Sequence, residues 1–428
     1  MRLELGSIPV TDVVFGSRTQ LDGGVLTVSQ TELCSVILQD ERLRSVGWEL
    51  AKPGDSARII PVKDVIEPRV KVAGIGTVFP GLIGTVDTVG SGRTHVLTGV
   101  AVVTTGSIAG FQEGIIDMSG PGAAYTPFSA TINLVMVAER VEGLSQHDHE
   151  QALRLAGLKA AAHLGEAARE ADPRYLAVYE TAPVAEARDR HQGLPKVVYV
   201  YMLQSQGLLH DTYVYGVDAK KLLPTFLFPT EVMDGAIVSG NCVSACDKNT
   251  TYHHLNNPVI ADLYAHHGRD LNFLGVVITN ENVTLADKER SSNYTAQLVE
   301  FLGAEGAIIT KEGFGNPDTD LMMNCAKLER KGIKTVLITD EFAGRDGASQ
   351  SLADASPLAD AVVTTGNANE VITLPPMDRM IGQPRAADTI AGGFAGSLRA
   401  DGSVSVELQA IIGATNELGF NRLTACPH

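Results

Sequence analysis

Four short apolar runs in the last third of the chain place the strongest constraint on its fold. Each run ends in threonine, and helical patterns separate the first three. Strands that alternate with helices at this spacing are typical of a parallel sheet with crossover helices. We therefore predict a mixed α+β N-terminal region followed by a doubly wound, mostly parallel Rossmann-like C-terminal domain. The runs are residues 275–279, 307–310, 334–339 and 361–365.

Helix boundary signals support this alternation. Asn316 and Pro317 have the residue types preferred at the N-cap and at the first helical position, and apolar residues follow at helical spacing. Gly303 and Gly332 stand where glycine ends a helix in the left-handed conformation. We expect the loops after the four strands to open toward residue 242.

The first half of the chain has weaker but readable signals. A turn precedes a predicted strand at residues 25–28, and Ser29 with Glu32 forms a capping box that begins a short helix. Residues 148–171 have the clearest helical periodicity, and residues 196–203 are typical of a buried strand. These patterns predict the mixed α+β region.

A glutamate follows each of the four runs. Ligands of doubly wound sheets bind outside the carboxyl ends of the strands, so four acidic loops at one edge predict a pocket for a cationic or amine group. The alternative is that each glutamate only complements the dipole of the following helix. The four residues are Glu281, Glu312, Glu341 and Glu370.

Charge and cysteine content restrict the classes of function. The 428-residue chain has a formal net charge of −16, which argues against nucleic-acid and anionic-membrane binding because both require a basic face. No apolar stretch is long enough to span a bilayer. Five cysteines without a secretion signal argue against a disulfide framework. We expect a cytoplasmic protein.

Residues 235–257 concentrate the groups that can carry chemistry, and three interpretations compete. Cys242, Cys246 and His253 or His254 could bind zinc, but the spacing lacks a second clear pair of ligands. Cys242 could equally be a small buried residue in a tight turn. The third interpretation is self-processing, in which the Cys242 thiol attacks the preceding carbonyl of Asn241 and the chain breaks there.

A family resemblance favours the third interpretation. The segment GNCVSACD, residues 240–247, resembles the processing site of the component B precursor of the glycine, sarcosine and betaine reductases. The resemblance extends over essentially the whole chain. Other similar stretches are residues 1–6 (MRLELG), 61–69 (PVKDVIEPR), 89–95 (VGSGRTH), 110–118 (GFQEGIIDM) and 412–419 (IGATNELG).

The resemblance implies a mechanism and a set of partners. The precursor would be cut before Cys242, leaving fragments 1–241 and 242–428 associated, with a pyruvoyl group at the start of the second. That carbonyl would hold the substrate amine as a Schiff base. A selenoprotein, component A, would then attack the α-carbon, component C would form acetyl phosphate, and a further component B subunit would assist. Electrons would come from thioredoxin-type donors.

Several residues are candidates for supporting roles. His253 or His254 could act as a base in maturation or Schiff-base formation, and Cys246 is the second thiol of the segment. The four glutamates would bind or orient the amine. No metal is expected. The alternative function is a non-catalytic assembly subunit, or one that binds small amines, without a pyruvoyl group.

Overall fold

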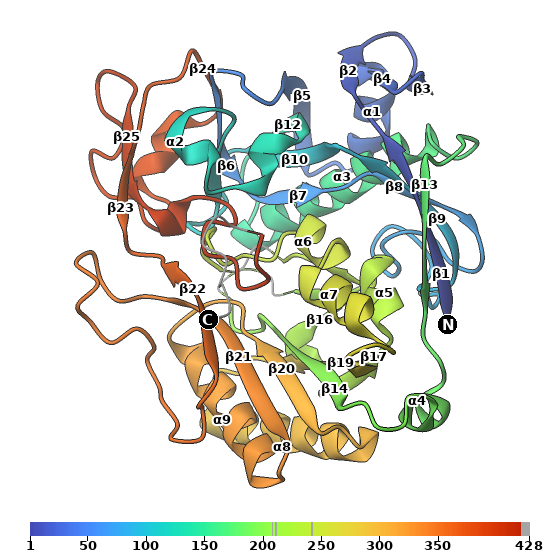
Figure 1. Ribbon diagram of the computed structural model, residues 1–428. Helices are drawn as coiled ribbons and strands as arrows, with labels where there is room; N and C mark the ends of the chain where they lie inside the picture. Colours follow the sequence, from blue (N-terminus) through green and yellow to red (C-terminus); the bar gives the residue numbers. More distant parts are fainter. Residues whose placement is uncertain (208, 210–211, 241–242, 421–428) are drawn as a thin grey trace.

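A six-stranded sheet, built mostly from the second half of the chain, organises the molecule (Figure 1). The computed structural model describes residues 1–207, 209, 212–240 and 243–420. The order of the strands is β17-β19-β14-β20-β21-β22, and all are parallel except β17. The strands are β14 (Lys196–Leu203), β17 (Thr225–Leu227), β19 (Asn272–Asn280), β20 (Gly306–Thr310), β21 (Lys334–Glu341) and β22 (Val362–Asn367).

The prediction that the four threonine-ended runs form parallel strands is confirmed, with one addition. Strand β14, which lies before residue 241 in the sequence, is inserted between β19 and β20. The register aligns the carboxyl ends, because Tyr201 of β14 pairs with both Ile278 and Thr310. After β14, the chain forms β19 on one side of this strand and then β20, β21 and β22, in that order, on the other side.

Helices cover both faces of this sheet. Tyr199 and Tyr201 of β14 pack in one core with α5 (Pro229–Met233) and α7 (Pro258–His266). Val198 and Val200 point to the other face and pack with α8 (Leu285–Leu302) and α9 (Asn316–Arg330). This alternation follows from the period of two residues in a strand. It explains why residues 196–203 form an almost continuous apolar run.

The helix boundaries differ slightly from the predictions. Gly303 does end α8 in the left-handed conformation, with φ of 74°. The N-cap of α9 is Gly315 rather than Asn316, because the Asp318 N–H donates to the Gly315 carbonyl and Gly315 has non-helical dihedral angles. Helix α3 (Gln146–Glu166) begins earlier than predicted because the Ser145 side chain caps it, accepting from the Asp148 N–H.

The other half of the molecule contains several smaller sheets, some of them mixed, as an α+β region should. Parallel β10 and β12 lie beside antiparallel β5 and β7, and α3 and α1 pack in the core next to them. The strands are β1 (Arg2–Pro9), β2 (Asp12–Phe15), β3 (Gln20–Asp22), β4 (Val25–Val28), β5 (Leu43–Ala51), β6 (Ala57–Val62), β7 (Asp64–Ile66), β8 (Arg69–Ala73), β9 (Gly92–Thr98), β10 (Val100–Gly106), β11 (Gly114–Asp117), β12 (Ile132–Arg140) and β13 (Tyr175–Glu180).

The remaining elements are short. The helices are α1 (Gln30–Ile37), α2 (Gly120–Ala123), α4 (Val184–Arg190) and α6 (Thr251–Leu255). The strands are β15 (Tyr213–Val214), β16 (Val217–Asp218), β18 (Ile237–Val238), β23 (Val371–Leu374), β24 (Arg379–Gly382) and β25 (Val404–Glu407). Strand β24 pairs with β6, so the end of the chain returns to the N-terminal half.

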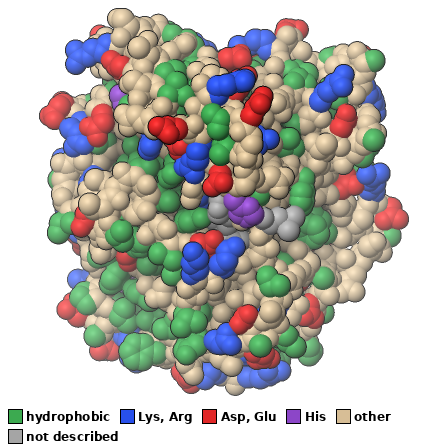
Figure 2. Space-filling model, turned by 180° about the vertical axis from the view of Figure 1, so that it is seen from behind, with side chains coloured by type: hydrophobic (Ala, Val, Ile, Leu, Met, Phe, Trp, Pro, Cys, Tyr) green, Lys and Arg blue, Asp and Glu red, His purple; other side chains and the backbone are tan. Residues whose placement is uncertain are grey.

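The surface shows no concentration of one charge on the face seen in Figure 2, where acidic and basic side chains are interspersed with apolar ones. Within the described part of the chain, every helix is too short or too polar to cross a membrane.

Strand β11 fixes one wall of the region around residue 242 through a glycine. A Cβ atom at Gly114 would lie 2.3 Å from the Ala245 Cβ, 2.9 Å from the Ile412 Cδ1 and 3.0 Å from the Ala410 carbonyl oxygen. Only glycine allows these segments to approach so closely.

We therefore expect Gly114→Ala to lower the free energy of unfolding by about 1–3 kcal/mol, because overpacking displaces backbone as well as side chains. Urea denaturation of the purified protein measures this change. The matched control is Gly47→Ala, where the Val137 carbonyl oxygen, 3.9 Å away, is the one atom found within 4 Å of the new methyl group. Equal midpoints for the two variants would contradict the packing argument.

Candidate active site at the carboxyl edge of the sheet

Residues 243–250 form a fully buried segment between β18 and α6. The C-terminal part of the chain holds this segment through backbone hydrogen bonds. The Cys246 N–H donates to Gln409 (3.2 Å), and the N–H groups of Gly413 and Thr415 donate to Ala245 (2.9 Å) and Cys246 (3.1 Å). Asn241 and Cys242 themselves lie outside the described residues. The segment that follows them, residues 243–250, is firmly packed.

An ionic cluster surrounds Cys246. Its Sγ lies 3.7 Å from the Asp247 Oδ1 and 4.0 Å from the Asp340 Oδ2, which also accepts from the Thr415 hydroxyl at 3.0 Å. The Lys311 Nζ donates to Asp318 at 2.6 Å and lies 3.9 Å from the Asp340 Oδ1. All these side chains are buried. They join β20, β21 and the segment after residue 242 at one edge of the sheet.

Burial determines the protonation of this cluster. It raises the pKa of Asp247 to about 7, against the opposing effect of Lys311. Burial and the neighbouring Asp247 raise the pKa of Asp340 well above its usual range. Burial lowers the pKa of Lys311, but Asp340 and Asp318 outweigh that effect, so its pKa is raised overall. The cluster thus holds a charged lysine beside carboxyl groups that retain protons near neutrality.

Glu281 and Glu312, two of the four glutamates singled out from the sequence, lie next to each other. The Glu312 N–H donates to the Glu281 Oε1 at 3.1 Å. The Glu312 carboxylate accepts from the Asn249 N–H at 2.9 Å and from the Gln204 N–H at 3.4 Å, so it connects β14, β20 and the segment after residue 242. Burial raises the pKa of Glu312 to about 7, and burial with the nearby Glu312 raises that of Glu281 well above the usual range.

The other two predicted glutamates lie elsewhere. Glu341 is partly buried and accepts from the hydroxyl groups of Ser351 (2.7 Å) and Thr364. Glu370 is exposed. Near the end of β21 the buried acid is Asp340, one residue before the glutamate singled out from the sequence. The side chains of successive strand residues point in opposite directions, so Asp340 and Glu341 cannot both face the cluster.

The two histidines have structural partners. The Nδ1 of His253 lies 3.0 Å from the Thr250 hydroxyl and 3.1 Å from the Thr250 backbone nitrogen, so it takes part in capping α6. The Nδ1 of His254 lies 2.7 Å from the Tyr201 hydroxyl. Burial lowers the pKa of each imidazole to about 3. Both rings are therefore neutral near pH 7.

These positions bear on metal binding. Among the described residues, the group whose ligand atoms lie within 4.8 Å of one another combines Cys246 with Asp247 and Asp340, not with the histidines. The positively charged Lys311 Nζ lies 3.9 Å from the Asp340 Oδ1, so this group already has a positive charge beside it.

An open cavity of about 410 Å³ begins at Val243 and Ser244, the first described residues after Cys242. The loops after β14 and β20 form its sides. It therefore lies where the sheet has β19 on one side of β14 and the later strands β20, β21 and β22 on the other. Ligands of open α/β sheets bind at such positions. The other lining residues are Phe111, Gln112, Gln204, Gln206, Gly207, Phe314, Asn316, Pro317, Ala391 and Gln409.

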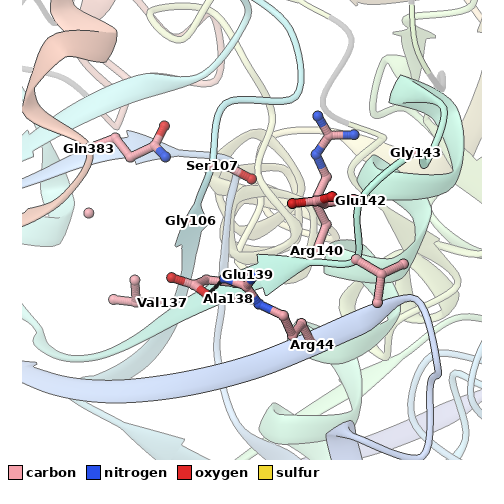
Figure 3. A pocket seen from close by; sticks show the side chains of 12 residues that line it. Arg44, Gly106, Ser107, Val137, Ala138, Glu139, Arg140, Glu142, Gly143 and Gln383 are labelled. Atoms are coloured by element: carbon pink, nitrogen blue, oxygen red, sulfur yellow. Dashed lines mark hydrogen bonds and ion pairs between the residues drawn. The ribbon is translucent and has the colours of Figure 1, made fainter.

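A second cavity, of about 440 Å³, is lined by charged side chains that include Arg140 and Glu142 (Figure 3). Its described lining residues include none from 243–250 or from the loop after β20. It is therefore separate from the candidate site.

Sequence reasoning missed several site residues. Asp247, Lys311 and Asp340 each adjoin a residue or run that was singled out, but nothing in a single sequence indicates that they meet. Glu417 was missed as well, although it lies in the C-terminal stretch that carried the family resemblance. Its Oε1 accepts from the Asn249 Nδ2 at 2.6 Å.

The raised pKa values predict how stability depends on pH. Asp64, Asp247 and Glu312 have folded-state pKa values of about 7. Between about pH 4 and pH 7 the folded protein then binds more protons than the unfolded chain, so these groups make stability fall as pH rises. His253 and His254 act oppositely, but only below about pH 6.5, where unfolded histidine titrates.

We expect the free energy of unfolding in urea to fall between pH 6.5 and pH 8. Glu312→Gln should reduce this fall, because an amide does not ionise. A protein that becomes more stable over the same interval would contradict the predicted proton uptake.

Comparison with known proteins finds relatives that match the chain over nearly its whole length. The model of a family described as glycine/sarcosine/betaine reductase component B subunits matches residues 1–426. The chain is 65% identical over 427 residues to the glycine reductase complex component B subunits alpha and beta of Acetoanaerobium sticklandii. It is 59% and 41% identical, over 425 and 439 residues, to the sarcosine and betaine reductase complex component B subunits alpha of Peptoclostridium acidaminophilum.

Each of these alignments covers 99% of both chains. No solved structure matches the chain. Full-length matches to the family model and to these relatives place the chain in the family of glycine/sarcosine/betaine reductase component B subunits.

Proposed function

We propose that this chain is the self-processing, substrate-binding subunit of a glycine, sarcosine or betaine reductase. The observation that carries the proposal is the cavity that begins at Val243 and Ser244. A reactive group formed at position 242 would adjoin it. One relative, aligned over 99% of both chains, is named as two subunits, alpha and beta, which supports cleavage into two fragments.

Cleavage would begin at Cys242. Its thiol attacks the Asn241 carbonyl, the peptide C–N bond breaks, and a thioester forms. Elimination across the Cα–Cβ bond then expels the thiocarboxylate on Asn241 and leaves a dehydroalanine. Tautomerisation and hydrolysis of the resulting imine release ammonia and leave a pyruvoyl group. Fragments 1–241 and 242–428 result, the second containing most strands of the six-stranded sheet.

The residues at the site fit a small carbonyl group and an amine substrate. When present, the pyruvoyl carbonyl holds a substrate amine as a Schiff base. The cavity gives the amine access, and a buried acid adjoins it, because the Glu312 carboxylate accepts from the N–H of Gln204, which lines the cavity. With pKa values near 7, Glu312 and Asp247 are able to exchange a proton at neutral pH. His253 and His254 are less suited to this role, because their pKa values are near 3.

The partners belong to the same proposal. A selenoprotein attacks the α-carbon of the bound substrate, a third component forms acetyl phosphate, and thioredoxin-type donors supply the electrons. An amine with an N–H can condense with a carbonyl, whereas the quaternary nitrogen of betaine cannot. Greater identity to the glycine and sarcosine proteins than to the betaine protein therefore favours glycine or sarcosine.

Substitution of Cys242 tests the proposal directly. Cys242→Ala should stay at full length and should not react with carbonyl reagents, because the attacking thiol is gone. Cys242→Ser should be cleaved more slowly, because a hydroxyl is a weaker nucleophile and carboxylate leaves less readily than thiocarboxylate. Mass spectrometry and hydrazide labelling of the purified chains give both readouts.

Cys246→Ala is the matched control. Cys246 does not adjoin the broken bond, so this variant should still be cleaved. Normal cleavage of Cys242→Ala would sink the proposal. A native protein that keeps an intact chain with a free Cys242 thiol would support the alternative, a non-catalytic assembly or small-amine-binding subunit.

The two fragments should remain together after cleavage without a covalent link. Strand β14 belongs to fragment 1–241 but pairs with β19 and β20 of fragment 242–428. Separating the fragments would break both pairings and expose both cores of the sheet. Native size-exclusion chromatography of the mature protein should show them eluting in one peak. Elution of the 242–428 fragment alone would count against this prediction.

A further inference from the structure

The wall of the candidate cavity is unusual in its chemistry. Among the described lining residues none has a formally charged side chain, whereas amide side chains come from four separate parts of the chain. A glycine or sarcosine substrate brings a carboxylate, which can only accept hydrogen bonds. The amide side chains are those of Gln112, Gln204, Gln206, Asn316 and Gln409.

Gln204 is positioned to donate into the cavity. Its side chain belongs to a residue only 5% exposed, and its Oε1 accepts from the N–H groups of Ser205 (3.1 Å) and Gln206 (3.3 Å). Those two bonds fix the amide so that its Nε2 points away from the loop backbone. Within the described parts of the chain, the Nε2 has no hydrogen-bond acceptor.

Gly313 shows where the Nε2 points. A Cβ atom built on Gly313 would lie 3.0 Å from the Gln204 Nε2, 3.1 Å from the Val243 Cγ2 and 3.6 Å from the Pro317 Cγ. The amide nitrogen, the segment that follows residue 242 and the first turn of α9 therefore converge on one small region.

A further donor and the beginning of a helix line the same cavity. The buried Nε2 of Gln206 has no partner among the described residues, and its Oε1 accepts from the Asn316 Nδ2 at 2.5 Å. Asn316 is the first residue of α9, a helix of 15 residues. The first turn of a helix has a partial positive charge, which favours a carboxylate. In α9 this charge is the contribution, because Pro317 has no N–H and the Asp318 N–H donates to the Gly315 carbonyl.

We propose that Gln204, together with Gln206 and the N-terminus of α9, binds the carboxylate of the amino-acid substrate while its amine faces residue 242. This inference rests on the proposed function, because it assigns the second end of the same substrate. The proposed subsite recognises the carboxylate through hydrogen-bond donors and not through a positively charged side chain. It should therefore disfavour glycinamide, whose carboxamide keeps one acceptor oxygen but turns its N–H₂ group toward a donor that would face the second carboxylate oxygen.

Two substitutions of Gln204 test this assignment. Gln204→Glu keeps an oxygen to accept from Ser205 and Gln206, so the loop retains its bonds, but it replaces the donor with an acceptor. Gln204→Met removes the donor without adding charge. The measurement is the amount of borohydride-trapped adduct on the 242–428 fragment as glycine concentration varies, with carbonyl content determined separately.

We expect the glycine concentration for half-maximal trapping to rise at least about tenfold in Gln204→Glu and about threefold or more in Gln204→Met. Carbonyl content should stay at the native level in both. On the native protein, glycinamide should need at least about tenfold more ligand than glycine, and Gln204→Glu should reduce that difference. The glycinamide comparison needs no variant, so it remains informative if a variant folds poorly.

Gln383→Glu is the matched control. The Gln383 Oε1 also accepts a backbone N–H, that of Ile108 at 3.2 Å, but Gln383 lines the other cavity (Figure 3). Its half-maximal concentration should match the native value. If carbonyl is present but both Gln204 variants trap glycine as the native protein does, the carboxylate assignment is wrong and the proposed function stands. If the native protein has no carbonyl, the proposed function fails, and the assignment fails with it.

Discussion

The pairing of β14 with β19 and β20 is the constraint on which the site depends. These strands are far apart in sequence, yet their register brings Leu203 beside Asn280 and Tyr201 beside Thr310. The loops that follow all three strands therefore meet at one edge. Gln204 enters from β14, Glu281 from β19, and Lys311 with Glu312 from β20. Without β14 in this position, the candidate cavity would lose one side and Glu312 would lose the Gln204 N–H.

The buried ionisable groups at this edge lower the stability of the folded protein, and hydrogen bonds satisfy only some of their oxygen atoms. Asp247 Oδ2, Glu281 Oε2 and Glu417 Oε2 are buried, and none has a hydrogen-bond partner among the described residues. An unpaired buried carboxylate is costly, so the groups hold protons instead, which is what their raised pKa values express. Such groups are common at functional sites, where proton transfer is needed near neutral pH. The chain therefore keeps unfavourable burial where the proposed chemistry requires proton exchange.

Much of the fold could be predicted from periodicity, because strands and helices leave local signals. The threonine-ended runs, the buried strand at residues 196–203 and the Gly303 helix end were recognisable in this way. The insertion of β14 between β19 and β20 was not, because strand order is determined by packing between distant segments.

The site residues were likewise predictable where the signal was local and not where it depended on packing between distant segments. Glu281 and Glu312 were singled out together with Glu341 and Glu370, because all four follow strand ends, and the structure brings the first two together. Asp340 was not predicted over Glu341, because the face to which each side chain points depends on where the strand bends. The separation of His253 and His254 from the acidic cluster also required the fold, since each ring satisfies a local or cross-element partner, Thr250 or Tyr201.

The size of the cavity is compatible with the proposed reaction, in which a second protein takes part. A volume of about 410 Å³ is within the range of pockets that enclose drug-sized ligands, so a molecule as small as glycine would occupy only a part of it. An enzyme that completed the reaction alone would gain by enclosing its substrate and excluding water. Here the exposed side chains of Phe111 and Phe314 line the cavity, and the buried Glu312 carboxylate accepts from the N–H of Gln204, another lining residue. Space above a bound substrate is what a reactive side chain from a second protein would need to reach the α-carbon.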